Sequence, residues 1–260
     1  MHSHNRDHGF NNIKARKGKL GYGMGLGIMI LDEEYPAFPG DLRNPSAYPY
    51  PIQYAVVNNV TCEMLIRAED KSPCRDSILT AAEELERMGC RAILGECGYF
   101  AYFQKEVKEH VNVPVFMSSL MQLSWMQQSI SAKKSIGILC AEKEYLLNEH
   151  FNALDIEPND TFIVAGARDD YECPQFEGLW NHNTGPAQGN YEKNEEELVL
   201  IAEDFTGKNP DMTALLLECT GMTPFARAIQ HKVDLPVYSW GTLMDFAYSI
   251  SVSRNYYGHV

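Results

Sequence analysis

The chain has 260 residues and a formal net charge of −13 at pH 7, with 45% hydrophobic and 22% charged residues. This composition is typical of a globular protein with one large domain or two small ones. The acidic excess disfavours nucleic acids and anionic membranes as partners, because both bind Lys and Arg. No apolar run approaches the roughly 20 residues of a membrane span, and the N-terminus lacks the apolar core of a signal peptide, so we expect a cytoplasmic protein.

The cysteine pattern gives no sign of a metal site. The seven cysteines are Cys62, Cys74, Cys90, Cys97, Cys140, Cys173 and Cys219, and no two have Cys-x-x-Cys spacing. The absence of this spacing disfavours a zinc site, and a disulfide framework is not expected in a cytosolic chain of this size. Each cysteine is therefore first interpreted as a small buried apolar residue, and any chemical role needs its own argument.

The predicted elements alternate between strands and helices. Residues 1–19 are polar, carry His2, His4 and His8, and predict a flexible tail. An amphipathic stretch over 73–88 predicts a helix that ends at Gly89, and a second helix is predicted to begin at Asn194 with a capping box. Apolar and β-branched runs predict strands over 26–31, 52–57, 91–94, 113–116, 135–139, 161–164, 213–217 and 235–238. The alternation predicts an α/β protein with mostly parallel sheets.

An internal repeat divides the chain into two similar halves. The segment Ala92-Ile-Leu-Gly-Glu-Cys97 aligns with Ala214-Leu-Leu-Leu-Glu-Cys219 at an offset of 122 residues, and the same offset pairs Pro114-Val115 with Pro236-Val237. We infer two pseudo-symmetric α/β lobes. The first is expected to comprise residues 20–117 plus 241–260, and the second residues 118–240.

Each half places a Glu-Cys pair at the carboxyl end of a predicted strand, where parallel sheets bind ligands. The amides of the following helix lower the pKa of a thiol at this position. If the halves face each other, Cys97 and Cys219 approach one cleft, which suits removal of a proton from one face of a stereocentre and delivery to the other. Glu96 and Glu218 point to the opposite side of their strands from the cysteines. Their roles have two alternatives: they orient the site, or they cap a helix or face solvent.

Four segments carry a resemblance to a known family. Residues 39–45, 95–104, 114–120 and 217–222 resemble the aspartate/glutamate/hydantoin racemase superfamily, in a poorly characterised branch, and the resemblance extends over about residues 25–250. That superfamily includes amino-acid racemases, hydantoin racemase, maleate isomerase and arylmalonate decarboxylase. The resemblance implies two flavodoxin-like lobes with parallel sheets, an active site in the cleft between them, and no metal or other cofactor.

The resemblance also implies roles for individual residues. Cys97 and Cys219 would be the catalytic acid and base. The substrate-binding residues would be Pro39, Gly40, Asn44, Gly98, Tyr99, Ser118, Ser119, Thr220 and Gly221, with residues 39–44 forming a closing loop. For the two serines, a turn or cap is an equal alternative. The amino-acid racemases usually follow their first cysteine with Asn-Thr, whereas this chain has Gly98-Tyr99, which favours a bulkier or more apolar substrate.

These patterns predict a cofactor-independent racemase or epimerase that inverts a carbon next to a carboxylate or carbonyl, in an amino acid, a hydantoin-like compound or a related acid. The alternatives are a cysteine-dependent decarboxylase or cis–trans isomerase, and a non-catalytic ligand-binding protein. The expected partners are the small carboxylate or carbonyl substrate and a second copy of the chain in a homo-oligomer such as a dimer, with no nucleic acid and no membrane. Residues 171–191 are interpreted as a surface loop, with a lid or an oligomer contact as alternatives.

Overall fold

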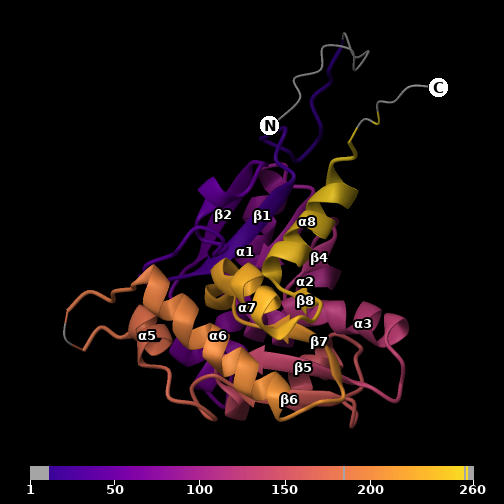
Figure 1. The fold of residues 1–260 in the computed structure, drawn as a ribbon. Coiled ribbons are helices and arrows are strands. Elements are labelled where there is room, and N and C mark those ends of the chain that lie inside the picture. The colour runs from indigo at the N-terminus through magenta and orange to yellow at the C-terminus, as the bar shows by residue number, and fades with distance from the viewer. Residues whose placement is uncertain (1–11, 184, 255, 257–260) are drawn as a thin grey trace.

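The structure is a computed structural model that describes residues 12–183, 185–254 and 256 (Figure 1). His2, His4 and His8 of the predicted tail lie outside the described residues. Residues 12–18 are exposed, Lys19 is partly buried, and none of them belongs to a helix or strand. Lys19 forms a salt bridge with Glu86 of helix α1 (Arg75–Arg87) at 2.7 Å, which anchors the end of this segment to the helix.

Two four-stranded parallel sheets form the centre of the molecule. The first has the order β2-β1-β3-β4 and the second the order β6-β5-β7-β8. The strands are β1 (Leu26–Leu31), β2 (Ile52–Val57), β3 (Ala92–Gly95), β4 (Val115–Phe116), β5 (Ser135–Cys140), β6 (Phe162–Gly166), β7 (Met212–Leu217) and β8 (Val237–Tyr238). The predicted strands are confirmed, with ends displaced by at most two residues. Because both sheets have the same order, which is the flavodoxin-like one, the predicted α/β fold with two similar halves is also confirmed.

Helices of varied length connect the strands. The α-helices are α1 (Arg75–Arg87), α2 (Gln104–His110), α3 (Leu123–Ser129), α4 (Asn148–Ala153), α5 (Pro174–Glu177), α6 (Tyr191–Gly207), α7 (Ala226–Val233) and α8 (Trp240–Ser251). Short 3-10 turns are η2 (Pro45–Ala47), η4 (Ser72–Cys74), η5 (Gly98–Phe103), η6 (Ser119–Gln122), η7 (Lys143–Tyr145), η8 (Gly178–Trp180) and η9 (Thr220–Phe225), and η3 (Glu63–Arg67) is a π-helical turn. In the described part of the chain, no helix has the length and apolar character needed to cross a membrane.

The predicted start of the long α6 helix is wrong. The helix begins at Tyr191, and its N-cap is Asn190, whose side chain accepts a hydrogen bond from the Lys193 amide at 3.0 Å. Glu197 does not serve a capping box, because its carboxylate accepts from the Gln175 and Phe176 amides and ties α6 to α5. The predicted inward face of this helix is confirmed, since Leu198, Ile201 and Phe205 are buried.

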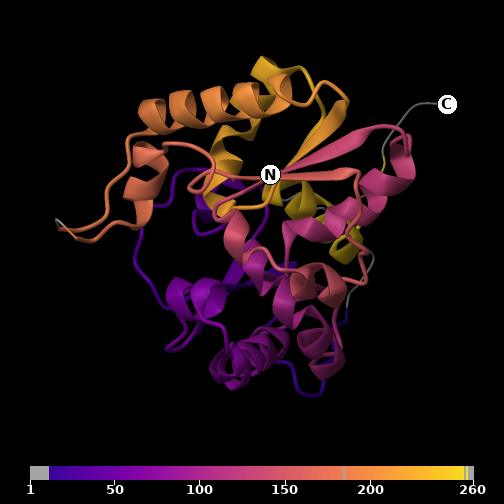
Figure 2. The ribbon, with the colours of Figure 1, turned by 90° about the horizontal axis from the view of Figure 1, so that it is seen from below.

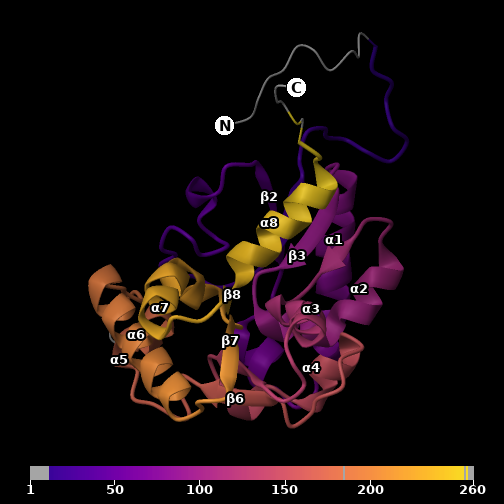
Figure 3. The same cartoon turned by 45° about the vertical axis from the view of Figure 1, so that its right-hand side comes forward.

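Helices cover both faces of the first sheet. On one face, Met29 and Ile93 pack in the same core as Ile78, Ala82 and Leu85 of α1. On the other face, strand residues such as Leu26 and Leu94 pack against Trp240, Leu243 and Met244 of α8. The C-terminal helix therefore runs from the second sheet back across the first (Figure 3). Figure 2 shows α6 and the purple helices of the first half at opposite ends of the molecule. The exact division into lobes at residues 118 and 241 stays a prediction.

Candidate active site

A cavity of about 380 Å³ lies where carboxyl ends of strands from both sheets converge. Its wall is formed by residues that directly follow β1, β2, β3, β5, β6 and β7, together with the segment around η8. The lining residues that matter below are Glu33, Glu34, Tyr35, Cys62, Glu63, Arg67, Glu96, Cys97, Tyr99, Glu142, Arg168, Glu177, Trp180, Cys219 and Thr220. The topology therefore forms one ligand-sized cavity at the position where parallel sheets bind ligands.

The structure brings Cys97 and Cys219 to this one cavity. Each is the N-cap residue of the 3-10 turn that follows its strand, η5 for Cys97 and η9 for Cys219. Both are free thiols, and Cys219 is 8% exposed. Their equivalent positions in the two sheets explain why the sequence repeat carries a cysteine in each half.

Burial raises the pKa of both thiols well above its ordinary value, and the charge of Glu218 is the next largest cause. The two thiols differ in what opposes this effect. The Tyr99 amide lowers the pKa of Cys97, whereas both the Gly221 amide and the charge of Arg168 lower the pKa of Cys219. The charge of Asp41 opposes Arg168 at Cys219, and the charge of Lys71 interacts favourably with a thiolate at Cys97. Each cysteine therefore has both an amide and a cation that favour its thiolate.

Glu96 anchors the loop after β1 to the end of β3. Its carboxylate accepts from both Nε and Nη2 of Arg43 and from the Leu31 amide, and its side chain is 1% exposed. Burial raises the pKa of Glu96 to about 7, while Arg43 acts in the opposite direction. The bidentate geometry favours the ionised carboxylate. Of the two roles left open for this residue, the structure supports orientation of the site.

Glu218 occupies the equivalent place in the second sheet without an equivalent partner. Its side chain is fully buried, and neither carboxyl oxygen has a hydrogen-bond partner of good geometry in the described part of the chain. Burial raises the pKa of Glu218 to about 8, the Ala141 amide lowers it somewhat, and the charge of Glu142 raises it. A Cβ atom on Gly98 would lie 1.9 Å from Oε1 of Glu218. The carboxyl group thus occupies space beside the residue that follows Cys97.

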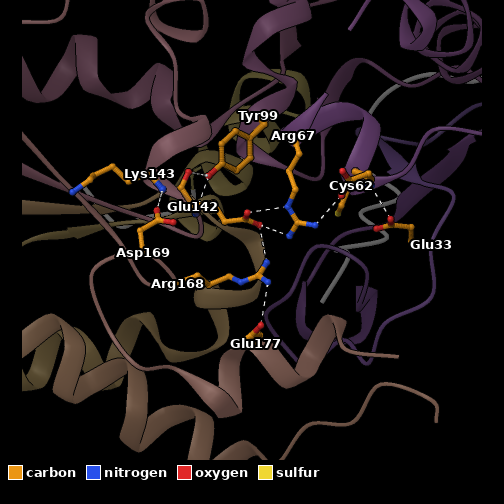
Figure 4. A network of polar contacts seen from close by, with 10 residues as sticks. Glu33, Cys62, Arg67, Tyr99, Glu142, Lys143, Arg168, Asp169 and Glu177 are labelled. Atoms are coloured by element: carbon orange, nitrogen blue, oxygen red, sulfur yellow. Dashed lines mark hydrogen bonds and ion pairs between the residues drawn. The ribbon is translucent and has the colours of Figure 1, made fainter. Parts of the chain in front are cut away.

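A polar network crosses the cavity from one half of the chain to the other (Figure 4). Arg67 donates to both carboxylate oxygens of Glu142 at 3.0 and 2.8 Å, and Arg168 donates to the same carboxylate at 2.7 Å. The Tyr99 hydroxyl donates to the Glu142 carbonyl at 2.7 Å and accepts from the Glu142 amide at 3.0 Å. Arg168 also approaches Glu177 at 3.4 Å. These contacts fix Glu142 between elements of both sheets.

Part of the segment at residues 171–191 lines the cavity, while most of its described residues are exposed, as expected of a surface loop. Trp180 and Tyr35 have ring centroids 5.5 Å apart. A Cβ atom on Gly221 would lie 2.7 Å from the Trp180 ring, which places the indole beside the turn that follows Cys219. Nε2 of the His182 ring lies 2.8 Å from the Glu34 carbonyl oxygen, and this contact links the segment to the loop after β1. Residue 184 lies outside the described part.

Tyr99 and Thr220 are the predicted substrate-binding residues that line the cavity. The Thr220 hydroxyl accepts from the Leu42 amide at 3.1 Å, so it also ties η9 to the loop after β1. Gly98 and Gly221 follow the two cysteines directly but are not part of the lining.

The remaining predicted binding residues lie outside the lining and have structural contacts. The side-chain amide of Asn44 donates to the Ala37 carbonyl, and Gly40 has a φ of 108° with Pro224 directly against it. Ser118 caps η6 by accepting from the Leu120 amide, and Ser119 donates to the Leu217 and Glu218 carbonyls. Pro39 forms a bridge with Asp41. The loop after β1 reaches the cavity through Glu33, Glu34 and Tyr35 instead.

Sequence reasoning missed several lining residues: Tyr35, Cys62, Arg67, Glu142, Arg168 and Trp180. Most of them follow the carboxyl end of a predicted strand, so the rule that identified the Glu-Cys pairs would have found them if it had been applied to every strand. Trp180 follows no strand and has no such signal. Within the described residues, no group of three or more His, Cys, Asp or Glu side chains is placed to hold a metal ion, and the absence of a metal stays a prediction.

Comparisons with known proteins give the chain relatives with a lyase activity. No family model matches the sequence. Dimethylsulfoniopropionate lyase 3 of Emiliania huxleyi (strain CCMP1516) is 31% identical over 221 residues, which are 82% of this chain and 56% of that protein. The dimethylsulfoniopropionate lyase of Durusdinium sp. clade D is 28% identical over 226 residues, which are 85% of this chain and 73% of that protein. The chain spans little more than half the length of the Emiliania huxleyi relative.

The relatives correct the predicted activity. The chain was expected to be an isomerase, a racemase or epimerase, but curated relatives that match over most of its length are lyases, so this expectation is wrong. The physical reason is that one scaffold with thiols at strand ends serves several reactions that begin by removing a proton next to a carboxylate. The alternative of a cysteine-dependent decarboxylase on the same scaffold, which is itself a kind of lyase, fits the relatives better.

Solved structures agree with the fold. A mutant arylmalonate decarboxylase is 14% identical with a TM-score of 0.57, covering 90% of this chain and 98% of that one. An aspartate racemase homologue from Pyrococcus horikoshii OT3 is 17% identical with a TM-score of 0.52, covering 86% and 99%. Allantoin racemase from Pseudomonas fluorescens is 12% identical with a TM-score of 0.52, covering 86% and 90%. The chain therefore has the fold of the aspartate/glutamate/hydantoin racemase superfamily.

Proposed function

We propose that this chain is a lyase that cleaves dimethylsulfoniopropionate, or a close analogue with a cationic leaving group on the carbon β to a carboxylate. The observation that carries the proposal is the match to dimethylsulfoniopropionate lyases over 82% of the chain. The cavity at the strand ends supports it, because this cavity contains thiols and is large enough for a small substrate.

The reaction is a β-elimination. A cysteine thiolate removes the proton from the carbon next to the carboxylate, and the electron pair of that C–H bond becomes the new carbon–carbon double bond. The bond between the β carbon and sulfur breaks, and its electrons leave with dimethyl sulfide. The products are acrylate, dimethyl sulfide and a neutral thiol, which returns its proton to water. One base is sufficient, so the exchange between two thiols that a racemase needs is not required.

Cys219 is the proposed base. The Gly221 amide and the guanidinium of Arg168, which lines the same cavity, both lower the pKa of its thiol. The charge that develops on the substrate carboxylate and α carbon needs hydrogen-bond donors nearby, and the guanidinium groups of Arg67 and Arg168 and the hydroxyl of Thr220 line the same cavity.

The charges of the cavity support a substrate with a cationic end. The lining carboxylates Glu33, Glu34, Glu63, Glu96, Glu142 and Glu177 outnumber the lining guanidinium groups of Arg67 and Arg168. Among the described residues, Glu33 and Glu34 take part in no ion pair. The Trp180 ring lines the same cavity, and aromatic faces attract quaternary and sulfonium cations, whereas the Tyr35 ring already has the Arg43 guanidinium over it at 4.4 Å. A zwitterion also fits a chain with a net charge of −13 better than a dianion does.

The test is a proton NMR time course of the purified chain with dimethylsulfoniopropionate. The proposal predicts that acrylate and dimethyl sulfide appear in equal amounts while the substrate disappears. Parallel samples with an aryl-substituted malonate measure release of carbon dioxide. Turnover of the malonate with no cleavage of the sulfonium compound would contradict the proposal and favour a decarboxylase.

A further inference from the structure

The buried carboxyl group of Glu218 has no role in the elimination described above. It belongs to the last residue before Cys219, and its side chain is fully buried while both carboxyl oxygens lack a partner in the described part of the chain. Its main-chain carbonyl, in contrast, accepts from Nε1 of Trp240 at 2.8 Å and from the Ser119 hydroxyl at 3.1 Å. The backbone at this position is therefore fixed, whereas the carboxyl group has only the Ala141 amide to oppose the effect of burial on its pKa.

The position of this carboxyl links the two halves of the site. Oε1 would lie 1.9 Å from a Cβ atom on Gly98, so the group from the second sheet fills the space of a side chain beside Cys97 of the first sheet. Only glycine leaves room for it. An ionised carboxylate is very costly in such a place, whereas a protonated carboxyl is tolerated.

The contrast with Glu96 shows that this arrangement is specific. Glu96 precedes Cys97 at the equivalent point of the repeat and is held by Arg43 and the Leu31 amide. Glu218 has no guanidinium in that role. The chain therefore neutralises one of its two strand-end carboxyl groups with a cation and leaves the other to be neutralised by a proton.

We propose that Glu218 is a positioning residue of the cleft, held protonated between the two strand ends, whose charge state decides whether Cys97 and Cys219 can form thiolates. The titratable groups whose charges interact with it come from three places: Cys97 and Tyr99 at η5, Cys140 and Glu142 at the end of β5, and Cys219 at η9. Apart from burial, its charge is the largest cause that raises the pKa of Cys97, Tyr99, Cys140 and Cys219. Ionisation of this one carboxyl would thus suppress the thiolates on both sides of the cavity.

The proposal concerns the thiols themselves and goes beyond the lyase reaction, so its test uses no substrate. The measurement is the rate of alkylation of each cysteine by iodoacetamide as a function of pH, followed by mass spectrometry of the peptides. The thiolate is the reacting form, so the rate reports its population. Cys62 lines the same cavity, and its pKa is raised by burial, Glu33 and Glu96 ahead of Cys219, with Glu218 not among the causes, so it should respond much less and serves as the internal comparison.

The variant is Glu218→Gln, which keeps the shape and a hydrogen-bond donor but cannot ionise. Below pH 7 the wild type and the variant should agree at Cys97 and Cys219, because Glu218 is then protonated. Above about pH 8, where Glu218 ionises, both thiols should react faster in the variant, on the order of tenfold, while the rate at Cys62 does not increase.

Identical curves for Cys97 and Cys219 in the two proteins would overturn the proposal. If the variant does not fold, the wild type alone decides. Its Cys97 and Cys219 curves should flatten near pH 8 while the Cys62 curve rises smoothly, and a simple one-proton curve at all three cysteines would overturn the proposal. Because no substrate is involved, failure here leaves the lyase proposal untouched, and failure of the lyase assay leaves this result untouched.

Discussion

Replacing Arg43 by alanine should remove the charge that neutralises Glu96 in the cavity wall. Arg43 donates to the Glu96 carboxylate through Nε and Nη2, and its other donors reach the Glu33 carbonyl and, at 2.8 Å, the Leu31 carbonyl. The side chains are 12% and 1% exposed, so water cannot replace the lost partner at Glu96. Breaking a buried pair by removing one partner costs about 3–5 kcal/mol of unfolding free energy, and we expect a loss of that size at pH 8.

The loss should depend on pH with a defined sign. Burial already raises the pKa of Glu96 from its ordinary value of 4.5 to about 7, and removal of the guanidinium raises it further. A carboxyl whose pKa is higher in the folded than in the unfolded chain binds extra protons on folding, so it makes the folded state relatively more stable as pH falls. Between pH 8 and pH 5.5 the variant should therefore recover about 1 kcal/mol relative to the wild type.

Urea unfolding of both proteins at the two pH values measures these differences. Arg75→Ala is the matched control, because Arg75 is 51% exposed and pairs with the exposed carboxylates of Asp76 and Glu106. Its removal should cost no more than about 1 kcal/mol at either pH. A loss at Arg43 as small as that of the control, or one that grows as pH falls, would refute the reasoning.

Three further changes test other contacts. Gly98→Ala introduces a Cβ atom 1.9 Å from Oε1 of Glu218 and should lower the unfolding free energy, measured with urea, by about 1–3 kcal/mol. The control is Gly207→Ala, which should not destabilise the protein because no atom lies within 4 Å of the added Cβ. Equal effects of the two changes would contradict the crowding at Gly98. Tyr99→Phe removes both hydrogen bonds to the Glu142 backbone and should lower the unfolding free energy by about 1–3 kcal/mol, and no loss would show that water replaces the hydroxyl. Trp180→Ala should raise KM for dimethylsulfoniopropionate more than it lowers kcat. The control Trp125→Ala changes an exposed side chain outside the cavity and should alter neither constant. An unchanged KM in Trp180→Ala would exclude the Trp180 ring from the binding site.

The fold could be predicted from the sequence because local patterns and the repeat agree with each other. Apolar runs such as Leu26–Leu31 become buried strands, and the repeat places Cys97 and Cys219 after equivalent strands, so their convergence follows from parallel topology. The start of α6 was missed because two asparagines compete as N-caps. Asn190 is the N-cap, because the Glu197 carboxylate accepts hydrogen bonds from the amides of α5 and does not complete a capping box at Asn194.

The reaction class and most of the cavity wall needed more than the sequence pattern. Arg67, Glu142 and Arg168 come from three loops of the two halves, and only the folded chain shows that they form one network. Trp180 reaches the cavity through a segment with no strand before it. The resemblance to racemases predicted the scaffold correctly and the activity wrongly, because the same strand-end thiols can start several proton-transfer reactions.

The most direct test of the account is the rate of acrylate formation from dimethylsulfoniopropionate by the wild type, Cys219→Ser and Cys62→Ser under the same conditions. Both cysteines line the cavity, so the comparison separates the proposed base from a thiol that merely lies nearby. A hydroxyl is a far weaker acid than a thiol and cannot supply the base at neutral pH, so Cys219→Ser should lose at least about a hundredfold in rate while Cys62→Ser retains most of it. Equal rates for wild type and Cys219→Ser, or no acrylate from the wild type, would contradict the account.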